Sequence, residues 1–230
     1  SRAAFAFFEN VREISFNGCF DTSAVTDMSI FFYECNSLES LDLSGFDTSQ
    51  VTTMRGMFEN CSKLASVDLS GFVTDRVGDM AYLFYGCMAL EEADLSAFDT
   101  AEVTDMSGMF YDCAALESLD VSGFDTGKTA AMPWMFYGCT RLSELDVSGF
   151  DTSRVTTMKS MFCGCQNLET LDISGFDTSR VTDMSYMFSG CRKLSRLKAG
   201  DFDLDLLQDA TGIFDQCDNL KIPGLNEPEE

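Results

Sequence analysis

Aspartates that recur at one fixed interval are the side chains of this sequence best able to bind a charged partner. Their spacing is 26 residues, and they are Asp42, Asp68, Asp94, Asp120, Asp146 and Asp172. If successive copies stack at the strand spacing of about 5 Å, they form an acidic strip that accepts cations or a basic peptide. Neighbouring carboxylates repel one another by only roughly 1 kcal/mol in water. The alternative is a solvated strip in which serines and backbone donors satisfy each aspartate.

A second set of aspartates recurs in a predicted turn and could hold calcium. It comprises Asp21, Asp47, Asp99, Asp125, Asp151, Asp177 and Asp203. Calcium needs about six to eight oxygens around one point, and the sequence has neither an EF-hand loop nor a glycine-rich nonapeptide repeat. Aspartates at such positions cap turns without any ion. We therefore predict turn capping, with no metal site and no cofactor.

The pair Cys163-Gly164-Cys165 is the one irregular spacing of thiols, and it is a weak metal or redox signal. The chain has no histidine to complete a zinc site. Cys163 takes a position that tyrosine holds in several other copies, which indicates a partly exposed, incidental thiol.

Aromatic side chains outside the repeated positions are the second candidate for binding. They differ from copy to copy and are Tyr82, Tyr85, Tyr111, Trp134, Tyr137 and Tyr186. Exposed aromatics of this kind form contact patches for partners. They could equally pack along the row of predicted helices, and the sequence leaves both interpretations open.

Catalysis and nucleic-acid binding find little support in the composition. The chain has no histidine, no G-x-S-x-G motif and no P-loop, and residues repeated in every copy make poor catalytic candidates because an active site needs one special place. A net charge of −23 disfavours nucleic acid and makes any charged partner cationic. No apolar run approaches the ~20 residues of a membrane span. We predict that the chain is not an enzyme.

The elements that position these side chains follow from an internal repeat. Eight cysteines lie 26 residues apart without slippage: Cys35, Cys61, Cys87, Cys113, Cys139, Cys165, Cys191 and Cys217. A fixed period of this length means one supersecondary unit stacked on itself. Phenylalanines recur in two further columns, at Phe20 to Phe202 and at Phe32 to Phe214, and are predicted core. We expect buried free thiols, because parallel side chains make disulfides awkward, although neighbouring copies lie within bridging distance.

Each copy divides into a strand and a turn, followed by an apolar segment. In LESLDLS, Leu41 and Leu43 alternate with polar residues, which predicts a strand. One strand per copy, always in the same direction, predicts a parallel ladder. In GFDTS, Gly45 and the short oxygens of the following residues predict a turn.

The apolar segment VTTMRGMFENC has the spacing of a short helix. Val51, Met54, Phe58 and Cys61 recur at offsets of three and four. Pro133, tolerated only in a first helical turn, places the helix start near Thr52 or Thr53. The predicted N-caps and helix ends are Thr26, Thr52, Thr104, Thr156 and Thr182, and Gly86, Gly138, Gly164, Gly190 or Asn60.

Together these elements predict an α/β solenoid of about eight 26-residue repeats. We expect a right-handed, leucine-rich-repeat-like coil, with the strand ladder on the concave side and short helices on the convex side. The chain is predicted to be a single repeat domain over residues 1–230. Residues 1–19 form an N-terminal cap plugged by Phe5, Phe7 and Phe8. Residues 20–217 form the repeats, and residues 218–230 form a C-terminal edge or the start of a linker.

The repeated motif LxxLDLSGFDTSxVTxMxxMFxGC resembles the 26-residue repeat of BspA-like bacterial surface proteins, over about Phe20 to Leu220. This resemblance implies a solenoid module of exported or cell-surface proteins that takes part in adhesion and host or protein contact. It implies no catalytic residues.

Three functions remain open at this point. The first is a non-enzymatic binding or adhesion module, extracellular or on the bacterial cell surface, that contacts a protein or glycan through a solenoid face. The second is a structural stalk or spacer without a specific ligand, and the third is an intracellular interaction scaffold. A binder should show a contiguous patch of side chains that differ between copies, whereas a spacer should look alike on every face. We expect a monomer.

Overall fold

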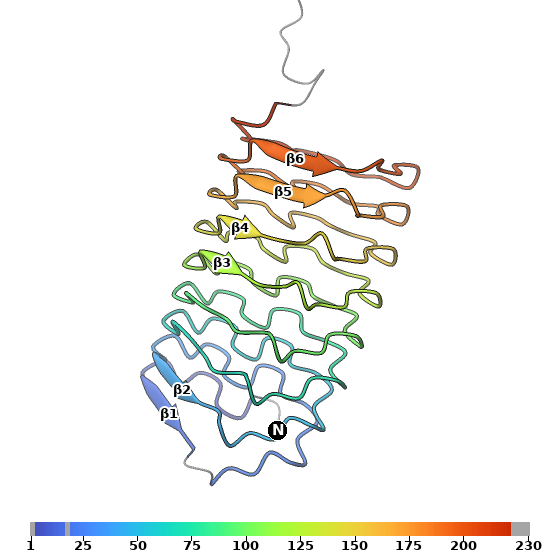
Figure 1. Ribbon diagram of the computed structural model, residues 1–230. Coiled ribbons are helices and arrows are strands. Elements are labelled where there is room, and N and C mark those ends of the chain that lie inside the picture. The colour runs from blue at the N-terminus through green and yellow to red at the C-terminus, as the bar shows by residue number, and fades with distance from the viewer. Residues whose placement is uncertain (1–2, 17–18, 222–230) are drawn as a thin grey trace, which may run out of the picture.

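The chain forms a stack of similar coils, one above the other (Figure 1). The computed structural model describes residues 3–16 and 19–221. Short strands follow one another along one side of the stack, from β1 at the blue end to β6 at the red end. Their bounds are β1 Glu13–Ser15, β2 Ser40–Asp42, β3 Ser118–Leu119, β4 Glu144–Leu145, β5 Thr170–Ile173 and β6 Arg196–Ala199.

The strands pair in parallel, as predicted, but the expected strand in every copy is wrong: no strand forms over 65–70 or 91–96, and the strands make three separate pairs. β1 pairs with β2, β3 with β4 and β5 with β6. The register places Ile14 beside Leu41, and it places Leu171 beside Leu197. Equivalent apolar residues of successive copies therefore lie next to each other. The handedness of the coil and the concave position of the strands stay predictions.

The predicted short helices are wrong: no helix occurs in the described part of the chain. The apolar segment runs instead as consecutive tight turns, joined sideways to the next coil. The N–H of Ile30 donates to the carbonyl of Arg55 at 2.8 Å, and the N–H of Phe32 donates to that of Met57 at 2.8 Å. An N–H used between coils is not available for the i→i−4 bond of a helix. Accordingly, the threonines predicted as N-caps do not cap; the Thr52 hydroxyl, for example, donates to the carbonyl of Thr26 in the preceding coil.

Left-handed residues explain why these turns cannot become helical. Ile30 and Glu34 have φ angles of 50° and 56°, and the same two positions recur with positive φ in the following coils. An α-helix requires φ near −63° at each residue, so a left-handed residue at every fourth position interrupts it. The glycines predicted to end helices, such as Gly86 at φ 71°, do adopt the left-handed conformation. They separate one turn from the next, however, and do not end a helix.

Pro133 is tolerated for a reason other than the one predicted. In a neighbouring coil the N–H of Ser107 donates to the side chain of Asp105 at 2.9 Å. At the equivalent place, Ala131 lacks the acceptor and Pro133 lacks the donor. No hydrogen bond is lost there, because both partners are missing together.

The interior consists of continuous rows of identical side chains, as the phenylalanine and cysteine columns predict. The rings of Phe84 and Phe110 are stacked with centroids 5.7 Å apart, and Phe110 stacks on Phe136 at 5.8 Å. Each thiol of the cysteine column donates to a phenylalanine carbonyl of the preceding coil; for Cys87 Sγ and Phe58 O the distance is 3.1 Å. These thiols are unbridged in the structure.

The first described residues add a further turn segment to the stack. Phe5 begins the phenylalanine row, because its ring stacks on Phe32 with centroids 5.7 Å apart. Phe7 and Phe8 were predicted to plug this end as well, but their side chains are 60% and 40% exposed. Of the predicted C-terminal edge, residues 222–230 lie outside the described residues.

Candidate functional site

The acidic strip lies on the strand side, and each of its aspartates caps the turn that follows. The carboxylate of Asp94 accepts the N–H of Ser96 at 3.0 Å, and Asp146 accepts that of Ser148 at 2.9 Å. The serine hydroxyl and N–H lower the pKa of these carboxyls. The geometry agrees with the solvated alternative, in which serine and backbone donors serve each aspartate. Binding of a partner by this strip stays a prediction.

The strip ends at a cation. Lys198 of β6 lies 2.8 Å from the Oδ2 atom of Asp172 in β5. This lysine holds the pKa of Asp172 well below its usual range. The strand face is therefore acidic along most of its length and partly neutralised at the β6 end.

The turn aspartates also cap turns, as predicted. Asp47 accepts the N–H of Ser49 at 2.9 Å. The threonine beside it has a larger role than the sequence suggested: the buried Thr48 hydroxyl donates to the carbonyl of Val73 at 3.0 Å and accepts its N–H at 2.8 Å. Within the described ranges, no three acidic or thiol side chains are placed to hold a metal ion together.

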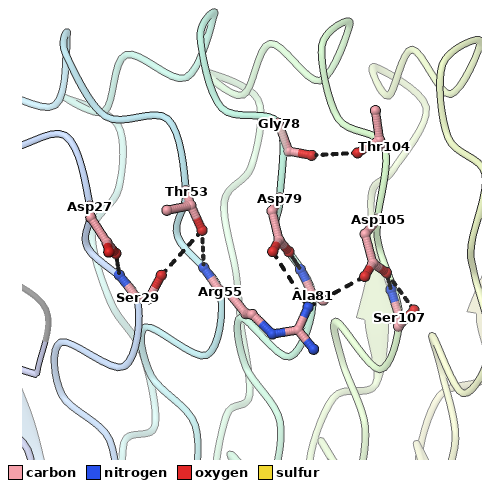
Figure 2. A network of polar contacts seen from close by, with 10 residues as sticks. All are labelled: Asp27, Ser29, Thr53, Arg55, Gly78, Asp79, Ala81, Thr104, Asp105 and Ser107. Carbon is pink, nitrogen blue, oxygen red and sulfur yellow. Dashed lines mark hydrogen bonds and ion pairs between the residues drawn. The ribbon is translucent and has the colours of Figure 1, made fainter.

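A third polar column is not among the residues that the sequence pattern indicated. It carries a parallel ladder from coil to coil and consists of Asp27, Thr53, Asp79, Asp105, Ala131, Thr157, Asp183 and Asp209. Figure 2 shows Arg55 reaching across two coils, with its Nη1 atom 3.4 Å from Asp79 and 3.3 Å from Asp105. A sequence signal was present: Arg55 and Lys159, the two cations two positions after this column, each follow one of its two threonines, Thr53 and Thr157.

Three tyrosines form a ridge on the turn side. Each lies six residues after the ladder residue of its coil. The rings of Tyr85 and Tyr111 are stacked with centroids 4.3 Å apart, and those of Tyr111 and Tyr137 with centroids 4.4 Å apart. We call these three residues the tyrosine ridge. Each is partly exposed, and burial raises the pKa of Tyr85 and Tyr111. The packing of the rings along the row is confirmed, and the rings still reach the surface. A contact patch for a partner stays a prediction.

The other predicted aromatics belong to a different column. Tyr82 contacts the ridge edge-on, with its ring centroid 5.8 Å from that of Tyr85, and its own face lies beneath the guanidinium of Arg55 at 4.8 Å. Trp134 and Tyr186 make no ring contact with the ridge among the described residues.

The left-handed column that carries Tyr82 alternates between large and small residues, because a large side chain lies over the next coil. A Cβ atom on Gly108 would come within 2.7 Å of the Tyr82 ring. Aromatic residues at this position therefore need glycine or another small residue in the following coil.

Cys163 follows Tyr137 in the column of the tyrosine ridge and is half-buried, whereas Cys165 is fully buried in the cysteine column. Burial raises the pKa of the Cys163 thiol. The two sulfurs therefore belong to different rows, which agrees with an incidental thiol.

Comparison with known proteins yields a family and similar solved structures. Residues 3–119, 66–145 and 114–226 match the model of the family described as "Mycoplasma protein of unknown function, DUF285". No curated protein matches the chain. Among solved structures, a leucine rich cell surface protein from Faecalibacterium prausnitzii A2-165 is similar, at 16% identity and a TM-score of 0.26, over 84% of this chain and 74% of that one.

The described residues contain no helix with the length and apolar character needed to cross a membrane.

Proposed function

The chain belongs to this family of Mycoplasma proteins of unknown function, and we propose that it is a non-enzymatic binding module of a bacterial surface or secreted protein. It contacts a protein or glycan through the turn side of its solenoid. The observation that carries this proposal is the tyrosine ridge. Tyrosine is enriched at the centres of protein interfaces, where its large ring and its hydroxyl both contribute.

The ridge is confined to one place on a repetitive molecule. In its column, Glu59 precedes Tyr85, and Cys163 and Ser189 follow Tyr137. A binding site needs such a local departure from the repeat, because a surface that is the same in every coil offers a partner no single position. The acidic strip lacks this property, since it has the same residue in each of its coils.

The surface location rests on the repeat unit itself. LDxSGFDTS and MFxGC, which recur throughout the chain, resemble the repeats of BspA-like bacterial surface proteins. A location outside the cell or on its surface and a monomeric state are parts of the same proposal. Brief protease treatment of intact cells, followed by immunoblotting, tests the location: the protein should be degraded, and full protection would contradict a surface site.

A second candidate, a spacer, is favoured by the uniformity of the strand side. There the same aspartate and serine recur from Asp42 and Ser44 to Asp172 and Ser174. A spacer needs length and solubility, which uniform solvated coils provide, and it needs no ridge.

Binding assays on arrays of glycans and immobilised extracellular-matrix proteins distinguish the two. The wild-type chain should bind at least one component, and Tyr111→Ser should weaken this binding at least about tenfold, as expected for a central interface tyrosine. Tyr33→Ser is the matched control, because Tyr33 holds the same position in a coil outside the ridge. Equal binding by both variants would place the contact elsewhere, and no binding at all would favour the spacer.

A further inference from the structure

We propose that the tyrosine ridge and the corner beside it bind a basic, amphipathic segment of a protein and not a glycan. This inference rests on the proposed function and specifies its partner. Three features of the same coils support it: the stacking of the rings, an apolar corner, and an acidic depression at the end of that corner.

The stacking of the rings leaves little aromatic face for a sugar. Tyr111 has Tyr85 on one face, with ring planes 12° apart, and Tyr137 on the other, at 6°. The face of Tyr82 is covered by Arg55. Sugar rings stack on open aromatic faces, whereas this ridge presents ring edges and hydroxyls. Edges and hydroxyls suit the side chains and backbone groups of a protein.

The corner that follows the ridge is apolar only in two coils. Three residues beyond Tyr85, the side chain of Met88 is 55% exposed, and Ala114 takes the same place beyond Tyr111. The next residue in each coil is alanine, namely Ala89 and Ala115. In the other described coils the same two positions hold polar residues, namely Asn36 and Ser37, Ser62 and Lys63, Thr140 and Arg141, Gln166 and Asn167, Arg192 and Lys193, and Asp218 and Asn219. An exposed methionine beside tyrosines is typical of a protein contact.

An acidic depression begins where the apolar corner ends. It has a volume of about 280 Å³ and is lined by Glu91, Glu92, Ala115, Glu117, Ser118 and Arg141. Arg141 pairs with Glu117. Glu91 and Glu92 form no ion pair within the described residues. A lysine or arginine of the partner therefore finds unneutralised carboxylates there.

Two carboxyls beside the ridge add to this preference for a cation. Glu59 and Asp112 are partly buried, and burial raises the pKa of both because it destabilises the ionised carboxylate. A cation placed beside them stabilises the ionised form. The partner therefore places apolar side chains over Tyr111 and Met88, and its basic side chains over these acidic groups. Since the net charge of the chain is −23, attraction over longer distances favours the same partner.

A short peptide of alternating lysine and leucine, labelled with a fluorophore, tests the inference by fluorescence anisotropy. The wild-type chain should bind it at physiological salt. Tyr111→Ser and Met88→Ser should each weaken binding by about five- to tenfold or more. The double variant Glu91→Gln/Glu92→Gln, which leaves the core intact, should weaken it by a similar factor.

The matched control is Glu169→Gln/Glu144→Gln. These residues hold the same two repeat positions as Glu91 and Glu92, carry the same charge, and lie outside the depression. The control should keep wild-type affinity. An equal loss in both double variants would mean non-specific attraction and would overturn the inference. A peptide in which serine replaces leucine should bind more weakly; equal binding of the two peptides would also count against it.

Failure of this inference differs from failure of the proposed function. Tyr111-dependent binding to a glycan, with no binding of the lysine–leucine peptide, would overturn the inference and leave the binding function standing. Loss of both would leave the chain as a spacer. Binding of the peptide that depends on Tyr111, Met88 and the two glutamates would support both.

Discussion

The buried threonines should be among the strongest polar links between coils, and Thr74→Val tests this directly. The Thr74 side chain is buried, and its hydroxyl donates to the carbonyl of Asp99 at 2.9 Å and accepts the N–H of Asp99 at 2.8 Å. Valine has nearly the same shape but no hydroxyl, so two backbone groups of Asp99 lose their partner at once. Leaving one such group unsatisfied costs about 1–3 kcal/mol. Because Asp99 lies partly at the surface, water recovers some of this cost, and we expect a net loss of about 2 kcal/mol.

Urea denaturation at neutral pH measures the loss, provided that the slope of the unfolding free energy with urea is unchanged. Thr104→Val is the matched control. Its hydroxyl is exposed and only donates, to the carbonyl of Gly78 at 3.0 Å, so its removal should cost less than about 0.5 kcal/mol. Amide exchange of the Asp99 N–H should accelerate in Thr74→Val and not in Thr104→Val. Equal stability of the two variants would refute the argument that threonine links the coils.

Three further predictions follow from the same structure. Gly108→Ala should destabilise the protein by at least about 1 kcal/mol, because φ is 56° and the new Cβ would meet the Tyr82 ring; a melting temperature equal to wild type would contradict this geometry. The folded pKa of Asp68 lies below its unfolded value, so its contribution is complete above about pH 4 and is lost as the pH falls through the folded pKa. Asp68→Asn should therefore lower stability at pH 7, and this loss should shrink as the pH falls through the folded pKa; a loss that stays the same down to acid pH would exclude an ionised cap. Burial raises the pKa of Cys87 to about 12, so the thiols of the cysteine column should resist a thiol reagent in the native protein, and all ten cysteines should react after unfolding without reductant.

The candidate site illustrates how far residue patterns reach. The aromatics could be selected from the sequence because they depart from the repeat, but their grouping could not. The period already implies that one column contains Tyr85, Tyr111 and Tyr137. The contact of Tyr82 with Arg55, in contrast, depends on a left-handed backbone that no local sequence motif predicts. The column of Asp79 and Asp105 was overlooked because it sits inside the segment predicted as helix.

That helix prediction failed for a physical reason. Val51, Met54 and Phe58 recur at offsets of three and four, and both an amphipathic helix and a series of tight turns place such residues on one side. The two structures differ in where the backbone N–H groups find acceptors. When one copy is considered alone, the i−4 carbonyl is the evident acceptor for each backbone N–H. Once the coils are stacked, the carbonyls of the next coil are equally close, and the N–H groups donate to them.

By itself, the sequence determined what depends on repetition: a strict period, an interior of like side chains in rows, and parallel strands in register, as Ile14 beside Leu41 demonstrates. Repetition suffices for these because equivalent residues in stacked copies must lie side by side. Only the tertiary structure decided how the turn side bonds and which aromatics meet. Both outcomes depend on groups one coil away, and those groups have no defined position until the neighbouring coil is in place.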